Sequence, residues 1–310
     1  MIEANHLTRQ FGRTTAVSNV SFSIDNSEVV GLLGPNGAGK TTIMRMLSGY
    51  LEPTTGSVTV NGENLGQNAY SIQRQLGYLP ENLPVYPEMI VADYMDYVAT
   101  IKCIEKAERS RAIREALIAT EMTQHALDTI GKLSRGQKQR VGVAQAVLGR
   151  PRFLILDEPS NGLDPNQTEQ MRSLIAQLSR RATIILSSHI MQEVEAVCDR
   201  VLIIRNGQLA LDQPLDTLRQ CNHMLLRTDQ AGHDLKLLLE QLPQIVSVEH
   251  APREDAICEY QLQLREGADP DTAAGNISQC VMQAGARLYQ LENQSRHLDD
   301  VFREVIDSGS

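Results

Sequence analysis

The chain contains one segment whose residue types and spacing match a loop that binds phosphate. Gly34 to Thr42 fits the pattern G-x-x-x-x-G-K-[ST]. An apolar stretch, Val29 to Leu33, leads into this segment, and a stretch with helical character, Thr42 to Leu47, leads out of it. Glycines let the backbone wrap closely around a phosphate chain, while N–H groups and the helix N-terminus point at the anion. The sequence therefore predicts that the chain binds a nucleoside triphosphate.

Two side chains of this loop have separate expected tasks. Lys40 adds a positive charge for the β- and γ-phosphates, and the hydroxyl group of Thr41 can hold Mg²⁺. A glycine-rich turn that fits the pattern by chance is the alternative, but the flanking strand and helix argue against it. The residues expected to surround the nucleotide are Gly34, Pro35, Asn36, Gly37, Ala38, Gly39, Lys40, Thr41 and Thr42.

Two acids, Asp157 and Glu158, end a second apolar stretch, Phe153 to Leu156. Behind a phosphate loop, Asp157 can hold the Mg²⁺ shell, as the second acidic strand does in phosphate-loop enzymes. Glu158 is then placed to orient or deprotonate the attacking water. The alternative is that both are solvated acids at the end of a strand. The expected catalytic groups so far are Lys40 and Glu158, with Thr41 and Asp157 at the metal.

The elements that must position these residues alternate between strand and helix in the first two thirds of the chain. Val17 to Ile24 alternates apolar and polar residues, as a half-buried strand does. Arg152 to Leu156, Thr183 to Ser187 and Arg200 to Ile204 are apolar strands separated by helical stretches. This order predicts an α/β fold with a parallel core sheet. Apolar residues at three- and four-residue steps predict a helical insertion over about residues 84–130.

The last third of the chain carries no phosphate motif but has a clear order of elements. Its patterns predict strand, helix, strand, strand, helix and strand over 224–228, 234–242, 245–249, 256–264, 273–284 and 286–291. A final helix is expected over 297–306. The β-α-β-β-α-β order is the ferredoxin-like arrangement. We therefore predict a core domain over residues 1–220 and a small C-terminal α+β domain over residues 221–310.

Composition limits the classes of protein that this chain can belong to. With 310 residues and a formal net charge of −9, the chain argues against a broad nucleic-acid footprint, which needs a basic domain. Its apolar runs are short, whereas a membrane helix needs roughly 20 apolar residues. The N-terminus lacks the basic and apolar regions of a signal peptide. Five scattered cysteines without a C-x-x-C spacing support neither a zinc site nor a disulfide framework. The chain is expected to be cytosolic or to dock on a membrane through another protein.

A short motif ahead of a helix gives the chain a family resemblance. Leu133-Ser134-Arg135-Gly136-Gln137 precedes a helical stretch, and Ser134 could cap that helix. At this distance before Asp157, the motif resembles the signature of ATP-binding cassette (ABC) proteins. The resemblance covers residues from about 3 to 215 and implies the P-loop NTPase fold of an ABC ATPase, with ATP and Mg²⁺ as cofactors.

In that family, ATP lies between two cassettes that face head to tail. The resemblance implies that Ser134 and Gly136 touch the γ-phosphate of ATP bound to the partner cassette. The usual signature has glycine where this chain has Arg135, which puts the fine geometry in question. Asp164 lies in the loop that crosses the dimer interface and is expected to link the two sites. His189 matches the switch histidine, which contacts the γ-phosphate and helps to position the water.

Two further positions take their expected roles from the same resemblance. Phe11 occupies the place of the family's aromatic residue that stacks on adenine, and the alternative is an ordinary buried phenylalanine. Glu81 stands where the family normally has glutamine, which reaches Mg²⁺ and the water and ties the site to the membrane partner. A carboxylate can still ligate Mg²⁺ but loses two hydrogen-bond donors. The alternative is that Glu81 is a solvated turn residue.

The resemblance predicts the ATP-hydrolysing subunit of an ABC exporter. Glu81 and the ending Leu298 to Glu304 resemble exporter cassettes of the drug-efflux and gliding-motility group. Two copies, or this chain and a homologous cassette, would drive a separate transmembrane permease from the cytoplasmic side of the cell membrane, without nucleic acid. The helical insertion and the Glu81 loop would receive the permease, with Tyr86, Met89 and Tyr94 as contact candidates. The alternatives are a soluble ABC ATPase that acts on ribosomes or DNA, and an importer cassette.

Overall fold

The computed structural model describes residues 1–219, 223–229, 233–251, 257–265, 267–294 and 297–307. The chain divides into two compact units, each described here by itself. The first unit contains residues 1–215 together with the described end of the chain from residue 302, and the second contains residues 216–301.

An antiparallel sheet begins the first unit. Its strands follow the order β2-β1-β4-β5, which are Thr14–Ile24, Ile2–Phe11, Thr55–Val60 and Glu63–Asn64. Along the end of β2, buried and exposed residues alternate, so that Val20, Phe22 and Ile24 share the inner face. This alternation is typical of an antiparallel sheet that has one face on a core and the other in water.

A six-stranded sheet forms the centre of the first unit. Its order is β10-β9-β3-β8-β7-β6, which are Gln208–Pro214, Arg200–Arg205, Val29–Leu33, Thr183–Ser187, Phe153–Leu156 and Leu76–Leu79. All neighbours are parallel except β10, which is antiparallel to β9. Every residue of β3, β7 and β8 is buried, as expected for parallel strands covered on both faces. The sequence-based expectation of a parallel α/β core is confirmed.

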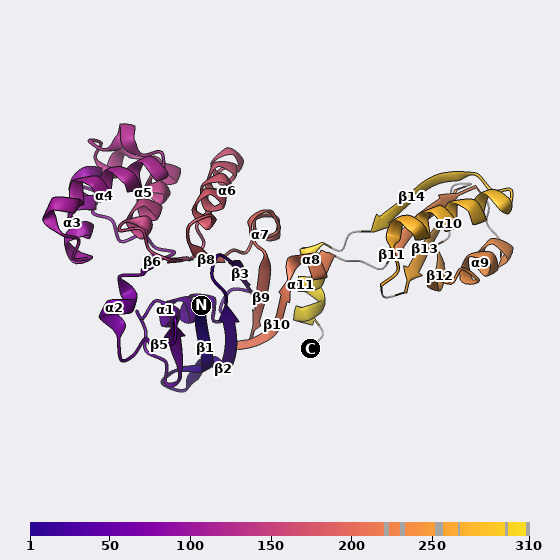
Figure 1. Ribbon diagram of the computed structural model, residues 1–310, viewed down its shortest axis with the longest axis horizontal. Helices are drawn as coiled ribbons and strands as arrows, with labels where there is room; N and C mark the ends of the chain where they lie inside the picture. The colour runs from indigo at the N-terminus through magenta and orange to yellow at the C-terminus, as the bar shows by residue number, and fades with distance from the viewer. Residues whose placement is uncertain (220–222, 230–232, 252–256, 266, 295–296, 308–310) are drawn as a thin grey trace. The chain divides into compact units, whose positions relative to one another are not determined.

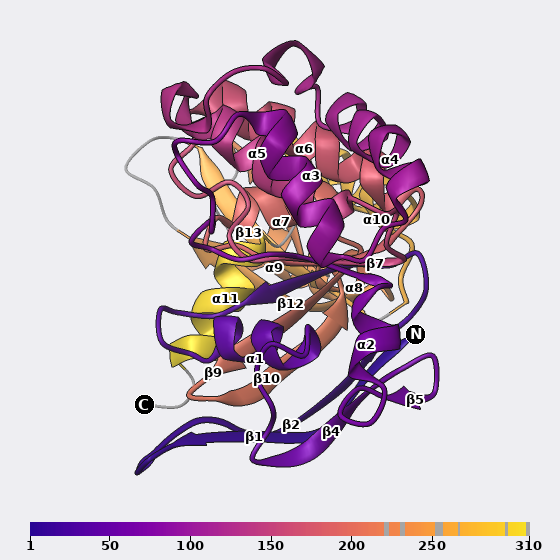
Figure 2. The same cartoon turned by 90° about the vertical axis from the view of Figure 1, so that its left-hand side faces the viewer.

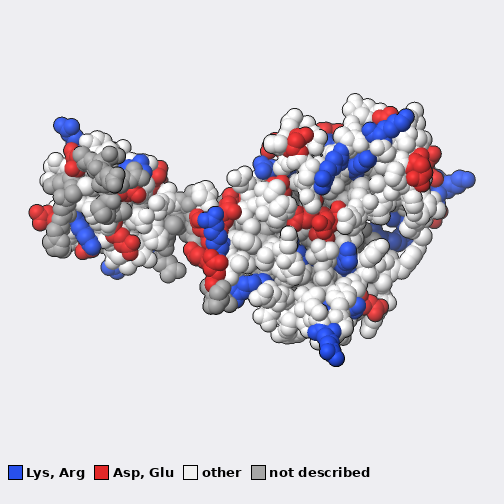
Figure 3. Space-filling view, turned by 180° about the vertical axis from the view of Figure 1, so that it is seen from behind, with Lys and Arg blue, Asp and Glu red and all other residues white. Residues whose placement is uncertain are grey.

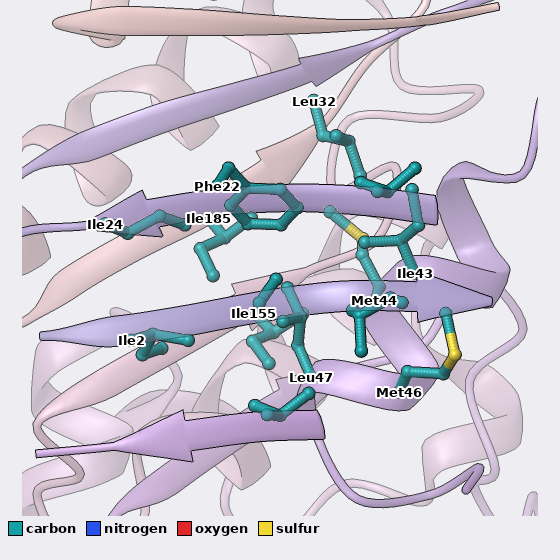
Figure 4. Packing of buried hydrophobic residues seen from close by; sticks show 14 of the residues in the cluster. Ile2, Phe22, Ile24, Leu32, Ile43, Met44, Met46, Leu47, Ile155 and Ile185 are labelled. Carbon is teal, nitrogen blue, oxygen red and sulfur yellow. The ribbon is translucent and has the colours of Figure 1, made fainter. Parts of the chain in front are cut away.

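Helix α1 (Lys40–Leu47) and both sheets contribute to one hydrophobic core. Figure 4 shows side chains of this core from α1, the antiparallel sheet and the parallel sheet. The labelled residues are Ile2, Phe22, Ile24, Leu32, Ile43, Met44, Met46, Leu47, Ile155 and Ile185, each at most 7% exposed. Because α1 is anchored by so many apolar contacts, the loop that precedes it is held in a fixed position.

Helices cover the rest of the first unit (Figures 1 and 2). They are α2 (Ala69–Gln73), α3 (Val91–Ile101), α4 (Lys106–Ala119), α5 (Arg135–Val147), α6 (Pro165–Ser179) and α7 (Met191–Val197). Single turns of 3₁₀ helix lie at Thr123–His125 and Ile130–Lys132. Helices α3 and α4 occupy the region where the sequence predicted a helical insertion. None of the helices within the described ranges is long and apolar enough to cross a membrane.

The second unit pairs a four-stranded antiparallel sheet with two helices. Its chain order is β11 (His223–Thr228), α9 (His233–Glu240), β12 (Ile245–Ala251), β13 (Cys258–Leu264), α10 (Pro270–Gln283) and β14 (Leu288–Gln294). The strands lie in the order β12-β13-β11-β14, and each neighbouring pair is antiparallel. This is the β-α-β-β-α-β order that the sequence predicts. Short helix α8 (Leu215–Arg219) precedes the unit.

The end of the chain differs from the predicted domain limits. The first unit ends at Leu215 rather than at residue 220, and from Phe302 the final helix α11 (Leu298–Asp307) groups with that unit again. The guanidinium group of Arg205 at the end of β9 donates a 2.7 Å hydrogen bond to the carbonyl oxygen of Val305. A charge-assisted bond of this kind between positions 100 residues apart is not visible in the sequence pattern.

Candidate functional site

The phosphate loop connects β3 to α1, and its glycines are required by close backbone packing. A Cβ atom on Gly34 would lie 2.4 Å from the carbonyl oxygen of Ile204, and one on Gly39 would lie 2.7 Å from that of Ala16. Gly39 also has a φ of +109° where it caps α1, a backbone region that glycine alone adopts readily. The loop is therefore clamped between two neighbouring segments, with the N-terminus of α1 at its end.

Lys40 is the first residue of α1 and is only 7% exposed. Its ammonium group donates to the carbonyl oxygens of Gly34 at 2.6 Å and Pro35 at 3.3 Å. These bonds hold the positive charge against the loop, where the anionic end of a nucleotide would meet it.

The carboxylate of Asp157, directly after β7, is fully buried. Its Oδ1 atom accepts hydrogen bonds from the hydroxyl groups of Ser187 at 2.7 Å and Thr41 at 3.4 Å. Its Oδ2 atom has no hydrogen-bond partner among the described residues. Burial raises the pKa of Asp157 above its ordinary 3.8; the two hydroxyl bonds oppose the shift, and the charges of Glu81 and Glu158 add to it. A buried acceptor without a donor suits a cation.

Glu158 and His189 form a pair at the ends of neighbouring strands. The Nδ1 atom of His189 lies 2.7 Å from Oε2 of Glu158. The backbone N–H of Glu158 donates to the hydroxyl group of Ser187 at 2.8 Å. Glu158 has a φ of +50°, which is strained for a residue with a side chain and is typical of functional sites. The pair therefore combines a carboxylate at a fixed position with an imidazole beside it.

Several of these groups line one cavity of about 590 Å³. It is lined by Ala16, Asn36, Gly37, Ala38, Gly39, Lys40, Thr41, Thr42, Glu81, Glu158, Asn161 and His189. The structure thus brings most of the predicted loop together with Glu81, Glu158 and His189. Gly34 and Pro35 do not line the cavity, but their carbonyl oxygens accept hydrogen bonds from Lys40.

Phe11 does not line the cavity but lies at the end of the β1–β2 hairpin, where it pairs with Thr14. It is 48% exposed, so the alternative of a buried phenylalanine is wrong. The guanidinium carbon of Arg9 lies 4.8 Å from the ring centroid, within reach of a cation–π contact.

The signature motif and the loop after Glu158 contact each other outside the cavity. Ser134 caps α5 through a capping box with Gln137, and Asp164 caps α6 by accepting from the backbone N–H of Gln167 at 2.8 Å. A Cβ atom on Gly136 would lie 2.8 Å from the Gln167 side chain. Arg135 covers Gly162, where an added Cβ atom would lie 2.1 Å from the guanidinium carbon. Ser134, Gly136 and Asp164 do not line the 590 Å³ cavity.

Comparison with known proteins agrees with this geometry. A family model described as ABC transporter matches residues 17–161. Over 308 residues, the chain is 32% identical to YxlF of Bacillus subtilis (strain 168), an uncharacterized ABC transporter ATP-binding protein, and the match covers 99% of each protein. This chain belongs to the ABC transporter family. The cassette is also 33% identical over 313 residues to the bacitracin transport ATP-binding protein BcrA of Bacillus licheniformis, covering 100% of this chain and 98% of BcrA.

A solved structure supports the fold of this ABC cassette. It is a dimeric structure of a post-hydrolysis state of the ATP-binding cassette MJ0796 bound to ADP and Pi. The two share a TM-score of 0.63 and 23% sequence identity, and the match covers 69% of this chain and 99% of that chain. The prediction of an ATP-binding, ATP-hydrolysing ABC subunit is confirmed by the family match.

Sequence reasoning left two residues of the ABC cassette's cavity out of the predicted site. Ala16 lies on β2, and its carbonyl oxygen faces Gly39; no pattern in the sequence marks it. Asn161 was placed only in the loop after Glu158, and its backbone N–H donates to the Glu158 carbonyl oxygen at 3.1 Å. The tight turn that this bond closes is what brings Asn161 back to the cavity.

Proposed function

We propose that two copies of this cassette, or this cassette and a homologous one, close head to tail around ATP and drive an export permease. The observation that carries the proposal is the split between two groups of residues. Lys40, Glu158 and His189 line the nucleotide cavity, whereas Ser134 and Asp164 lie outside it. There the residues beside them, Arg135 and Gly162, contact each other. Residues that belong to the same reaction but to separate surfaces of one copy can meet only when a second copy supplies them. The dimeric ATP-binding cassette MJ0796 is a precedent for such pairing.

Within the proposed site, each side chain has a task that follows from its chemistry. The Lys40 ammonium binds the β- and γ-phosphates once the nucleotide replaces its contacts with the loop carbonyls. Glu158 accepts the proton of the attacking water as a general base, and His189 holds that carboxylate and contacts the γ-phosphate. Phe11 offers an exposed aromatic face for the adenine base.

A divalent cation fits beside Asp157. The hydroxyl group of Thr41 and the unpartnered Oδ2 atom of Asp157 are hard oxygen ligands, which Mg²⁺ prefers, and Glu81 also lines the cavity. The described residues contain no group of three His, Cys, Asp or Glu side chains that could hold a metal alone. This donor set therefore suits an ion that shares its coordination with substrate phosphates. Mg²⁺ would neutralise charge that develops on the β- and γ-phosphates.

The permease would be a separate chain that holds the cassette at the cytoplasmic side of the membrane. In the helical insertion, Tyr94 is a core residue, because it is 2% exposed and its hydroxyl group bonds to Gln145. Tyr86 and Tyr97 are each 44% exposed with ring centroids 5.7 Å apart, so they are the better permease contacts. Because the relative BcrA is a bacitracin transport ATP-binding protein, an antibiotic is the proposed class of cargo.

One of the two alternatives receives less support. A cassette that acts on ribosomes or DNA needs a basic surface, but on the face shown in Figure 3 basic and acidic side chains are interspersed. The net charge of −9 points the same way. Transport direction in vesicles that contain the permease would distinguish an importer from an exporter.

Replacing Glu158 by glutamine tests the proposal. The amide keeps the shape of the side chain but cannot take a proton, so we expect ATP binding to persist while the turnover rate falls by about 10² or more. With Mg²⁺ and ATP present, the variant should accumulate as a dimer in size-exclusion chromatography. Glu63→Gln, an exposed acid on β5, is the matched control. Near-normal turnover of Glu158→Gln would rule out the general-base role, and an ATP-loaded monomer would rule out the composite site.

A further inference from the structure

Two adjacent serines at the end of β8 make different sets of bonds. The hydroxyl group of Ser187 donates to Oδ1 of Asp157 at 2.7 Å and accepts from the backbone N–H of Glu158 at 2.8 Å. The hydroxyl group of Ser188 instead donates to Oε2 of Glu193 at 3.0 Å and accepts from the backbone N–H of Ile190 at 3.0 Å. Both serines are almost completely buried, so neither hydroxyl group exchanges its partners for water.

Glu193 is an unusual residue for its position. It lies in the first turn of α7 and is only 4% exposed, and its second carboxylate oxygen has no hydrogen-bond partner among the described residues. Burying a carboxylate costs free energy that one hydroxyl bond does not offset, so an apolar residue would serve packing better. The acid is therefore better explained by what its bond to Ser188 fixes than by stability.

The bond from Ile190 to Ser188 closes a short turn with His189 at its centre. A serine hydroxyl group that accepts from the N–H group two residues later fixes the backbone direction between the two. The side chain of His189 is 54% exposed, so packing does little to hold it. The direction of its imidazole towards Glu158 thus depends on this turn.

We propose that Glu193, acting through Ser188, is a positioning residue that aims His189 at Glu158. Ser187 sets the backbone of Glu158, and the Ser188–Glu193 pair sets the backbone of His189, so two neighbouring serines fix the two halves of one catalytic pair. The inference rests on the proposed function, because it gives Glu158 and His189 their roles in ATP hydrolysis. Neither Ser188 nor Glu193 lines the nucleotide cavity, so they act on the reaction only through His189.

The test compares Ser188→Ala, Glu193→Ala and Glu193→Gln in the full chain. For each, the turnover rate and KM for ATP hydrolysis, the Tm, and the imidazole NMR resonance of His189 are measured; the resonance is assigned by its loss in His189→Gln. We expect the two alanine variants to lower the turnover rate by about tenfold, with KM changed by less than about twofold, and to move the His189 resonance. Glu193→Gln keeps an acceptor for Ser188 and should restore most of the rate. Gln192→Ala, exposed on the same helix, is the matched control.

Separate outcomes distinguish failure of this inference from failure of the proposed function. Normal turnover in both alanine variants, while Glu158→Gln is inactive, overturns the positioning role alone. So does a rate that falls only in step with the Tm while the His189 resonance stays in place. If Ser188→Ala does not fold, the comparison of Glu193→Ala with Glu193→Gln decides, because equal rates in these two would also contradict the role. Normal turnover of Glu158→Gln would overturn the proposed function instead.

Discussion

At the scale of single residues, Asp157, which we propose as a Mg²⁺ ligand, lowers the stability of the nucleotide-free cassette. Its burial raises the pKa, so the folded state holds the proton more tightly than the unfolded chain does. Stability therefore falls as the pH rises from about 3.8 through the raised pKa, and it stays lowered at neutral pH. Such a cost is expected where a charged group is kept for function.

Asp157→Asn should therefore stabilise the nucleotide-free protein. The amide oxygen can still accept from Ser187, and no charge is buried, so we expect a gain of about 1 kcal/mol at pH 7. The gain should shrink as the pH falls through the raised pKa, because the carboxyl group of the folded wild type is then protonated and its burial costs less. Calorimetric melting at several pH values measures it, with Asp96→Asn, an exposed acid on α3, as the control. A stability gain over wild type that is smaller at pH 7 than at pH 4 would contradict this account.

Single residues also differ in how far the sequence could predict their place in the site. Lys40, Asp157 and Glu158 were predictable because parallel strands deliver their carboxyl ends to one edge, so motif spacing along the chain becomes proximity in space. Glu193 was not predictable, since an acid among apolar residues in a short helix reads as a solvated side chain. Its burial depends on tertiary packing that local patterns do not encode. Phe11 was assigned from resemblance, and only the structure shows its exposure.

At the scale of elements, the start of α5 and the loop before α6 pack through Arg135 and Gly162. Gly162 has a φ of +69°, so alanine there is strained and would also displace the guanidinium group of Arg135. We expect Gly162→Ala to cost about 1 kcal/mol of unfolding free energy. Part of that cost should vanish when Arg135→Gly is combined with it, because residues in contact are coupled. Urea denaturation of the two single variants and the double variant measures the coupling. If their changes in unfolding free energy simply add, the contact between Arg135 and Gly162 contributes nothing to stability.

The opposite end of α5 is held by Lys102, which directly follows α3. Its ammonium group donates to the carbonyl oxygens of Gln145, Ala146 and Leu148 at 2.9 to 3.1 Å. These are among the last carbonyl groups of the helix, which have no partner within it. Helical periodicity predicted α3. It could not predict that the lysine after α3 would cap the end of α5, because periodicity describes each helix by itself. The helix that begins with the signature motif is thus tied to the insertion that we expect to face the permease.

Lys102→Met should weaken this tie in a pH-dependent way. Removing the three bonds is expected to lower the unfolding free energy by about 1–2 kcal/mol at pH 7. Burial lowers the pKa of Lys102 to about 8, so the unfolded chain binds the proton more tightly than the folded state does. The contribution of Lys102 to stability should therefore grow as the pH rises from about 8 towards 10.5. Denaturant titration at pH 7 and pH 9.5 tests this, with exposed Lys106→Met as the control. A difference that shrinks at pH 9.5 would contradict the assigned direction.

At the scale of the whole molecule, helix α11 is divided between the two units: its first residues group with the second unit, and from Phe302 it groups with the first. The ferredoxin-like order of β11 to β14 was predictable because its strands alternate and its helices are bounded by proline or glycine. The return of α11 to the first unit was not, since an amphipathic helix shows that it has an apolar face but not which surface receives it. The bond from Arg205 to Val305 makes the final turns of the chain part of the ATP-binding unit.

Two shortened chains separate the tasks of the two units. Ending the chain after Gln220 removes α11 together with the second unit, whereas replacing residues 221–297 by a flexible glycine–serine linker keeps α11. Both should bind ATP, because the cavity is lined by residues between Ala16 and His189. Only the first leaves Arg205 without the acceptors at Val305 and Ile306, so its Tm should lie several degrees below that of the linked chain. Arg205→Met in the full chain should reproduce part of that decrease. Equal melting of the two shortened chains would show that α11 adds nothing to the first unit, and the return of the chain would then have no energetic consequence.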